Sequence, residues 1–266
     1  MVGDVVGKPG RFAVADFVPK LRSSLKVDFV ICNAENSAAG LGITRDIANN
    51  LYDQCKVDVI TLGNHAWSKR ESHNFLDEEM RILRPANYPP GVPGQGMGVY
   101  KTPFGPIAVI VLQGRIFMDP TENPFLMVED LIQEAQKTAK MIFIDFHGEA
   151  TSEKIAFAWH VDGRVSAVVG THTHVQTADE RILPGGTAAL TDVGMTGPEH
   201  SVIGMNVDSA LTRFVTLMAS KFEVAPGPAR LCGVVIDIDP ETGHATHIER
   251  VQKLQVEDDD IDEDED

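Results

Sequence analysis

The sequence predicts an α/β fold, because short apolar segments alternate along the chain with segments of helical spacing. The apolar segments are mostly rich in Val and Ile and span at most six residues, which favours buried strands over helices. Several of them end directly in carboxylate, amide or histidine side chains. The chain contains no run of 18 or more apolar residues, so no membrane-spanning helix and no membrane partner are predicted.

The apolar segments predict six strands and a late hairpin. The hairpin is expected from residues 231–239 and 244–251, which flank the turn Pro240–Gly243. The strands are predicted, in chain order, over Met1–Gly3, Phe29–Ala34, Val57–Leu62, Ile107–Leu112, Met141–Phe146 and Val165–Val169.

Apolar residues recur at helical spacing between these strands. Thr44 can cap the second helix, and Pro19 is expected to end or bend the first one. The predicted helices are Arg11–Ser24, Arg45–Cys55, Val128–Ala139 and Ser152–Trp159, and long loops are expected over Pro85–Gly98 and Gly114–Phe125.

The charge distribution divides the chain into a body and a tail. The formal net charge is −16, and residues 257–266 contain nine acidic residues. Such a run repels itself, so a disordered tail over 257–266 and a single domain over 1–256 are expected. The body has no stripe of Lys and Arg, which argues against long nucleic acid as a partner.

The cysteines and the first residues indicate a cytoplasmic protein. Cys32, Cys55 and Cys232 are widely spaced and form no CxxC pair, so they are expected to be reduced and buried. Residues 1–11 have no apolar stretch of the secretory kind. Only three residues precede Asp4, which is therefore expected on a short strand with a fraying end.

Polar side chains follow five of the predicted strands. In open α/β sheets, ligands bind beyond the carboxyl ends of the strands, so these side chains are expected to meet. Taken singly, each has an ordinary structural explanation, such as a turn or a hydrogen-bonded core histidine. The residues are Asp4, Glu35, Asn36, Asn64, His65, His147, His172 and His174.

Because possible metal ligands follow all five of these strands, the sequence predicts a metal centre. Alternation along an extended chain would project the imidazoles of His172 and His174 to one side. Two metal ions about 3.5–4 Å apart can clamp the attacking and leaving oxygens of a phosphoryl group, with Glu35 as a bridging carboxylate. Mixed imidazole and carboxylate ligands suit Mn, Fe or Zn better than Mg or Ca.

The motifs around these residues resemble a known family. Gly63-Asn64-His65 resembles the GNH motif of calcineurin-like metallophosphoesterases, and residues 170–174 (GTHTH) resemble their GHxH-type motif. The closer similarity is to the bacterial YmdB-type branch of 2′,3′-cyclic-nucleotide 2′-phosphodiesterases, from residue 1 to about residue 252. It is carried by GDVVGKPGR (3–11), NAENSAAGLGIT (33–44), TLGNHAW (61–67), IDFHGEATSEK (144–154), VGTHTHVQTADERILPGGTA (169–188), TDVGMTGP (191–198) and SVIGM (201–205).

Two positions depart from the general superfamily pattern. Val6 stands where most members have a histidine ligand, and Glu35 stands where an aspartate normally bridges. Both departures are typical of the YmdB-type branch. The resemblance implies a sandwich of two mixed β-sheets flanked by α-helices, and hydrolysis of small phosphodiesters such as 2′,3′-cyclic nucleotides. A homo-oligomer is compatible with this family type.

The resemblance also implies a role for each residue. One metal ion, Fe or Mn in the first place and Zn as a further option, would be held by Asp4, Glu35 and His174. The second would be held by Glu35, Asn64, His147 and His172. A hydroxide bridging the metals would attack phosphorus, His65 would protonate the leaving ribose oxygen, and Asn36 would contact the phosphate or the metal-bound solvent.

Two other functions are compatible with the sequence. A regulatory or signalling protein could keep the metal site and turn over slowly, with the acidic tail and the long loops as its working parts. A metal-dependent amidohydrolase also uses HxH. In those enzymes, however, the HxH ends the first barrel strand, whereas here it comes late in the chain.

Overall fold

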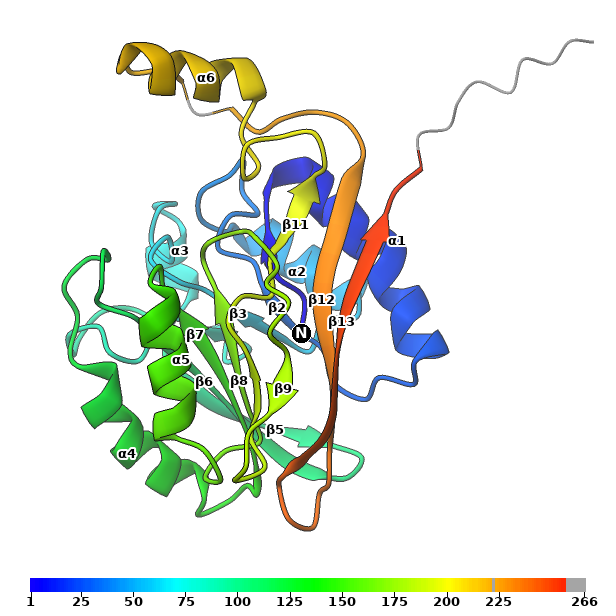
Figure 1. Cartoon of the computed structure of the whole chain (residues 1–266), viewed down its shortest axis with the longest axis vertical. Coiled ribbons are helices and arrows are strands. Elements are labelled where there is room, and N and C mark those ends of the chain that lie inside the picture. Colours follow the sequence, from blue (N-terminus) through cyan, green and yellow to red (C-terminus); the bar gives the residue numbers. More distant parts are fainter. Residues whose placement is uncertain (222, 257–266) are drawn as a thin grey trace, which may run out of the picture.

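The computed structural model describes residues 1–221 and 223–256, and the predicted acidic tail over 257–266 lies outside the described residues. Two β layers pack against each other, and helices cover their outer faces (Figure 1). The apolar core between the layers joins Ile31 and Val59 of one layer to Val109, Phe143 and Val169 of the other. The predicted α/β sandwich with mixed sheets is therefore confirmed.

The first layer is a six-stranded mixed sheet in the order β5-β6-β7-β8-β10-β9. Strands β6, β7, β8 and β10 are parallel, whereas β5 and β9 run antiparallel to their neighbours. Helices α4 (Pro124–Ala135) and α5 (Thr151–His160) cover its outer face (Figure 1). The strands are β5 Met97–Thr102, β6 Gly105–Gln113, β7 Met141–His147, β8 Ala167–Thr171, β9 Arg181–Ile182 and β10 Ala188–Leu190.

The second layer consists of two sets of strands, in the orders β1-β11-β12-β13 and β2-β3-β4. Val2 joins the sets, since it forms a parallel bridge with Cys32 and an antiparallel bridge with Gly233. Helices α1 (Gly7–Ser24) and α2 (Arg45–Asp53) pack on its outer face. The strands are β1 Asp4–Val5, β2 Ile31–Asn33, β3 Val59–Thr61, β4 Ile82–Leu83, β11 Met195–Pro198, β12 Ala229–Ile238 and β13 Ala245–Leu254.

Several predicted elements are confirmed by the structure. Thr44 caps α2, accepting a hydrogen bond from the backbone N–H of Ile47 at 3.3 Å. The late hairpin forms as β12 and β13. The three cysteines are free and buried. None of the helices within residues 1–221 and 223–256 is both long and apolar enough to cross a membrane.

Other boundaries were wrong. Strand β1 begins at Asp4 rather than Met1, and α1 runs through Pro19 because Val14 and Val18 keep this helix packed on the core. Helix α4 starts at Pro124, one turn before the predicted Val128. The side chain of Asn123 caps it by accepting a hydrogen bond from the backbone N–H of Phe125. Pattern reasoning also missed the short elements α3 (Ser72–Phe75), β4, β5, β9, β10 and β11, and helix α6 (Val207–Thr216).

Candidate metal centre

The polar residues at the strand ends meet at one edge of the two layers. Glu35 follows β2, Asn64 follows β3, His147 ends β7 and His172 follows β8. One ligand atom from each of Glu35, His147 and His172 lies within 4.8 Å of the others. Asn64 and His172, which are 83 and 25 positions from His147 in the sequence, therefore contact its ring directly.

The Nε2 atom of His147 is surrounded by three polar atoms. It lies 3.0 Å from Oε1 of Glu35, 2.9 Å from Oδ1 of Asn64 and 3.1 Å from Nδ1 of His172. A single ring N–H can satisfy only one of these neighbours. A carboxylate oxygen, an amide oxygen and two imidazole nitrogens at such separations are the donor set of a transition-metal ion.

Asp4 adds a second carboxylate to this site. It is fully buried, and its Oδ2 accepts a hydrogen bond from the backbone N–H of His172 at 3.2 Å. Its Oδ1 has no hydrogen-bond partner among the described residues. Since buried carboxylate oxygens are almost always satisfied, this orphaned atom fits a bound cation.

His174 lies on the Asp4 side of the site. Its Nδ1 is 2.9 Å from the backbone carbonyl oxygen of Ile203, so Nδ1 carries a hydrogen and donates it to that oxygen. Burial raises the pKa of Asp4 to about 7, and the charge of His174 is the largest opposing influence on it. The backbone carbonyl of His174 accepts a hydrogen bond from Met195, the strand partner of Asp4, so the two residues lie in neighbouring parts of the site.

The HxH segment is not extended, so the predicted alternation of its imidazoles was wrong. Strand β8 ends at Thr171, and His172 and His174 have φ values of 103° and 65°. Residues other than glycine adopt such values at a cost, and these outliers cluster at functional sites. The first imidazole consequently turns toward His147, and the second toward Ile203.

A buried ion pair holds this strained segment in place. Lys154 of α5 lies 2.7 Å from Oδ2 of Asp192 and also donates to the backbone carbonyl of Thr171 at 2.8 Å. Asp192 accepts hydrogen bonds from the backbone N–H and the hydroxyl of Thr173 at 3.0 and 2.8 Å. The segment from Thr171 to Thr173 is thus tied at both ends to charged groups that water cannot reach.

The metal-free site contains an internal ion pair. Burial works to raise the pKa of Glu35, but the charge and hydrogen bond of His147 lower it to about 2. Burial likewise works to lower the pKa of His147, but Glu35 raises it to about 9. Burial, followed by the charge of His147, lowers the pKa of His172 to about 3. Near neutral pH, Glu35 is therefore anionic, His147 cationic and His172 neutral.

Metal affinity is expected to rise with pH, because a metal cation must displace the protons that Asp4 and His147 hold. Below about pH 7 both Asp4 and His147 hold a proton, whereas between about pH 7 and 9 only His147 does. Each displaced proton changes the apparent affinity by about tenfold per pH unit. Calorimetric titration of the metal-free protein at pH 8, in buffers of different ionisation enthalpy, should show close to one proton released. No proton release would contradict this picture.

Asp145 supports the ring of His147 through a threonine. Fully buried Asp145 accepts hydrogen bonds from the hydroxyl groups of Thr61 at 2.5 Å and Thr171 at 2.7 Å. Since the Thr171 hydroxyl donates to Asp145, its oxygen accepts from Nδ1 of His147 at 2.9 Å. This leaves Nε2 of a neutral His147 free to bind a metal. Sequence reasoning missed Asp145, although an aspartate within the apolar run of β7 was a signal.

Replacing Asp145 by asparagine is expected to weaken metal binding by about 10–100-fold, as is typical for residues that orient a ligand. Asparagine has one acceptor oxygen where Asp145 has two, so it cannot accept from the hydroxyl groups of Thr61 and Thr171 in the same way, and the direction of the Thr171 hydroxyl, and hence the hydrogen on His147, is no longer fixed. Calorimetric titration of each variant with Mn²⁺ would measure the affinity for the metal. Asp162→Asn is the matched control, because Asp162 accepts a backbone hydrogen bond from Gly185, on another loop. Equal affinities in both variants would rule out the supporting role.

Gly63 is required by the approach of His147. A Cβ atom at position 63 would lie 2.2 Å from Nε2 of His147, far inside van der Waals contact. Gly170 has a similar role, since a Cβ there would lie 1.7 Å from the carbonyl oxygen of Thr191. The glycines that begin both short motifs are therefore explained by close packing behind the site.

His65 and Asn36 border the cluster. The backbone N–H of His65 donates to Oε2 of Glu35 at 2.9 Å, and its ring Nε2 lies 3.3 Å from Nδ2 of Asn64. Burial lowers the pKa of the His65 ring. Asn36 donates to the carbonyl oxygen of Gly40 at 3.0 Å, while its buried Oδ1 has no partner among the described residues. Direct contacts thus link six of the eight predicted residues, whereas the side chains of Asn36 and His174 contact Gly40 and Ile203 instead. The six are Asp4, Glu35, Asn64, His65, His147 and His172.

A cluster of carboxylate, amide and imidazole donors at the strand ends of a two-layered α/β fold defines the metallophosphoesterase class of protein. Comparison with known sequences then identifies the family. Residues 1–251 match the family of YmdB-like proteins, and the chain belongs to this family.

Individual relatives cover nearly the whole chain. The 2′,3′-cyclic-nucleotide 2′-phosphodiesterase of Bacillus subtilis is 53% identical over 250 residues, which are 94% of each chain. A crystal structure of a hypothetical protein from Thermus thermophilus superposes with a TM-score of 0.90 at 41% identity, covering 96% of this chain and 98% of that one. A novel phosphatase from Mycoplasma pneumoniae also gives 0.90, at 35% identity, covering 95% of this chain and 92% of the other.

Proposed function

We propose that this protein is a metal-dependent phosphodiesterase that hydrolyses small phosphodiesters such as 2′,3′-cyclic nucleotides. The observation that carries the proposal is the crowding of three polar atoms around Nε2 of His147, which only a shared cation satisfies together. The Bacillus subtilis relative of that name supports the substrate class.

The donors can be divided between two metal ions. Asp4, Glu35 and His174 would hold one ion, and Glu35, Asn64, His147 and His172 the other. Both carboxylate oxygens of Glu35 face the cluster side, one near His147 and one near the backbone of His65, which suits a bridging ligand. The mixture of oxygen and nitrogen donors suits Fe or Mn best, with Zn as a further option. Such ions lower the pKa of bound water and neutralise charge on a phosphoryl group.

The remaining residues would act on the substrate directly. His65, beside the cluster but outside the donor set, would hold the proton for the leaving ribose oxygen. Asn36 would use its unpartnered Oδ1 and its amide to orient the phosphate or the solvent around it. The ion pair of Lys154 with Asp192 would keep His172 and His174 in their strained conformation while substrate binds.

A diester screen tests this function. Protein loaded with Mn or Fe should hydrolyse 2′,3′-cyclic AMP and a nitrophenyl diester, with 3′,5′-cyclic AMP and a linear dinucleotide as comparison substrates. Elemental analysis should give two metal ions per chain. A protein that holds two ions yet hydrolyses none of these diesters would instead be a regulatory, metal-binding protein.

We infer that residues 1–256 form a single domain. We also infer that the protein is cytoplasmic, which the free buried cysteines support.

We further infer that the protein is a homo-oligomer. Helix α6 stands away from the body in Figure 1, and it exposes Leu211, Phe214 and Val215, with Phe214 75% exposed. Light scattering of the intact protein tests the oligomeric state.

A further inference from the structure

The imidazole of His172 makes polar contacts on two sides. Its Nδ1 lies 3.1 Å from Nε2 of His147, so this nitrogen faces the donor cluster. On the other side of the ring, Nε2 lies 3.3 Å from Oε2 of Glu149. Within residues 1–221 and 223–256, the two ring nitrogens have no further polar contact. The ring therefore lies between the donor cluster and a single carboxylate.

The backbone places Glu149 beside His172. Strands β7 and β8 end side by side, since His147 is the register partner of Thr171. The N–H of Gly148 donates to the carbonyl oxygen of Thr171 at 3.3 Å, so the chain stays paired one residue beyond the end of β7. Glu149 and His172 are the next residues on the two segments. Their contact thus follows from the strand pairing and does not depend on a distant loop.

The contact with Glu149 determines which nitrogen of His172 carries the hydrogen. A carboxylate only accepts, so Nε2 of the neutral ring is the donor and Nδ1 keeps its lone pair. Nδ1 is the nitrogen that is directed at the donor cluster. Without an acceptor at Nε2, either nitrogen could carry the hydrogen, and half a turn of the ring would replace Nδ1 by a carbon atom.

The other two imidazoles of the ligand set also have an oxygen acceptor. Nδ1 of His147 donates to a threonine hydroxyl at 2.9 Å, and Nδ1 of His174 donates to a backbone carbonyl at 2.9 Å. Histidines that bind metals almost always donate their second ring N–H to such a group, which fixes the orientation of the ring. Glu149 is the corresponding group for His172.

We propose that Glu149 is a positioning residue of the metal centre, whose carboxylate accepts the hydrogen on Nε2 of His172 and so presents Nδ1 to the metal ion. The inference rests on the metal site of the proposed function and adds a residue to it. The side chain of Glu149 is 48% exposed, and its carboxylate has no second polar partner in the described part of the chain. A role in stabilising the core is therefore not available to it.

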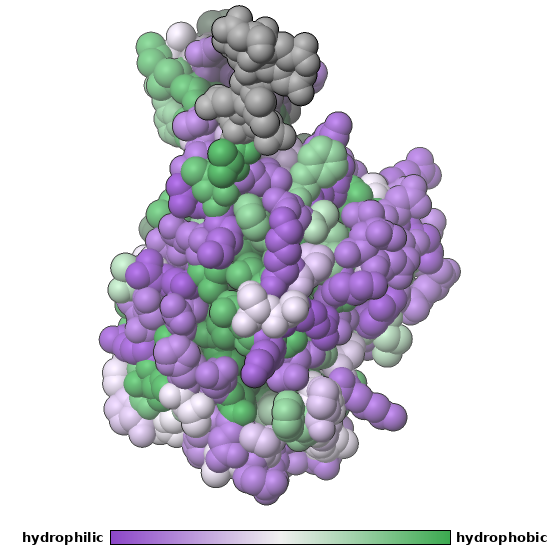
Figure 2. All heavy atoms as spheres, turned by 90° about the vertical axis from the view of Figure 1, so that its right-hand side faces the viewer, coloured by the Kyte–Doolittle hydropathy of each residue, from purple (hydrophilic) through white to green (hydrophobic). Residues whose placement is uncertain are grey.

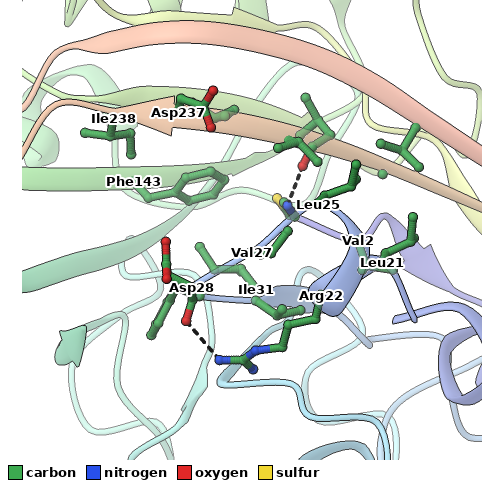
Figure 3. Close-up of a pocket in the computed structure, with 18 of the residues that line it drawn as sticks. Val2, Leu21, Arg22, Leu25, Val27, Asp28, Ile31, Phe143, Asp237 and Ile238 are labelled. Atoms are coloured by element: carbon green, nitrogen blue, oxygen red, sulfur yellow. Dashed lines mark hydrogen bonds between the residues drawn. The ribbon is translucent and has the colours of Figure 1, made fainter. Parts of the chain in front are cut away.

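Exposure alone would give Glu149 no role. Charged side chains are ordinary on protein surfaces, and Figure 2 shows a face of this molecule that is largely hydrophilic. The groove in Figure 3 does not include Glu149 either, because it is lined by apolar side chains such as Leu21, Val27 and Phe143. An ordinary surface carboxylate contributes little to the binding of a nearby charge. The contact with His172 is what distinguishes Glu149.

Metal binding by the intact protein tests this role. Glu149→Ala should weaken Mn²⁺ binding by about 10–100-fold in calorimetric titration, because Nδ1 of His172 is no longer held toward the ion. Asp119→Ala is the matched control for loss of a charge. Asp119 is an exposed carboxylate whose charge acts on the ring of His65, and its side chain contacts no imidazole among the described residues. Equal losses of affinity in the two variants would overturn the proposal.

The ring N–H of His172 provides a second readout. In the zinc-loaded protein, NMR should detect the hydrogen on Nε2 of His172 as a signal protected from exchange with water, and Glu149→Ala should lose this signal. The ring N–H of His147 should be detected in both proteins, because its acceptor is unchanged. A His172 signal that is equally protected in the variant would overturn the proposal.

The metal-free proteins provide a control for folding. Glu149→Ala should unfold within about 2 °C of the unaltered protein, because it replaces a half-exposed side chain outside the core. A much larger fall in the Tm would show that Glu149 stabilises the fold, and it would contradict the positioning role. None of these measurements uses diester hydrolysis, so their outcome is separate from that of the diester screen.

Discussion

Replacing Glu35 by glutamine is expected to lower phosphodiesterase turnover by about 1,000-fold or more and to release bound metal. Glu35 is 1% exposed, and one of its carboxylate oxygens lies 3.0 Å from Nε2 of His147. Glutamine has nearly the same shape but lacks the charge that a pair of cations needs between them. Loss of several kcal/mol of metal and transition-state stabilisation corresponds to roughly three or more powers of ten in rate.

The comparison for Glu35→Gln is Glu129→Gln on α4. Glu129 pairs with Arg164 and His160, so the control removes a carboxylate and its ion pairs from another part of the protein. Metal content by elemental analysis and kcat for 2′,3′-cyclic AMP should fall in Glu35→Gln alone. A Glu35→Gln protein with two bound ions and more than a tenth of normal turnover would exclude the bridging role.

Replacing His65 by alanine is expected to slow hydrolysis of 2′,3′-cyclic AMP by about 10²–10⁴-fold while leaving the metal content unchanged. The backbone N–H of His65, which alanine retains, makes the contact to Glu35, so the donor set should survive. The lost group is the ring, which would supply a proton to the leaving ribose oxygen. A nitrophenolate leaving group needs no such proton, so the nitrophenyl diester should lose much less rate.

His73→Ala is the matched control, since His73 lies on the exposed surface of α3. It should leave both activities unchanged. If His65→Ala slows the nitrophenyl diester and the cyclic nucleotide to the same extent, His65 positions the substrate or the metal and does not donate a proton. Loss of metal from His65→Ala would likewise contradict the assignment.

Local patterns in the sequence were sufficient to predict the layers and the meeting point of the polar residues. The buried strand β6 shows a continuous apolar run, and the run of β7 is interrupted only by Asp145, because both faces of these strands are covered. Since strand direction determines where the carboxyl ends lie, the sequence predicts Glu35, Asn64 and His147 at one edge. The GNH and HxH motifs indicated which superfamily the site at this edge resembles.

Long-range contacts decided what local patterns could not. The left-handed conformations of His172 and His174 depend on Asp192 and on Lys154 from another helix. The orientation of the His147 ring depends on Asp145 through a neighbouring strand.

The dependence on long-range contacts also explains why some strands and a helix were not predicted. Strands β1 and β11 form short pairs whose partners lie far apart in sequence, so no periodic run marks them. Helix α6 has a single buried residue, Ala210, so its exposed apolar side chains follow no core-facing pattern.

Which side chains are available, and at which strand ends they stand, follows from the local pattern of residues, because strand and helix periods are local properties of the chain. How these side chains face one another follows only from the packing of the whole fold. Asp4 meets the backbone of His172 across 168 positions, and such a contact depends on the packing of every intervening element.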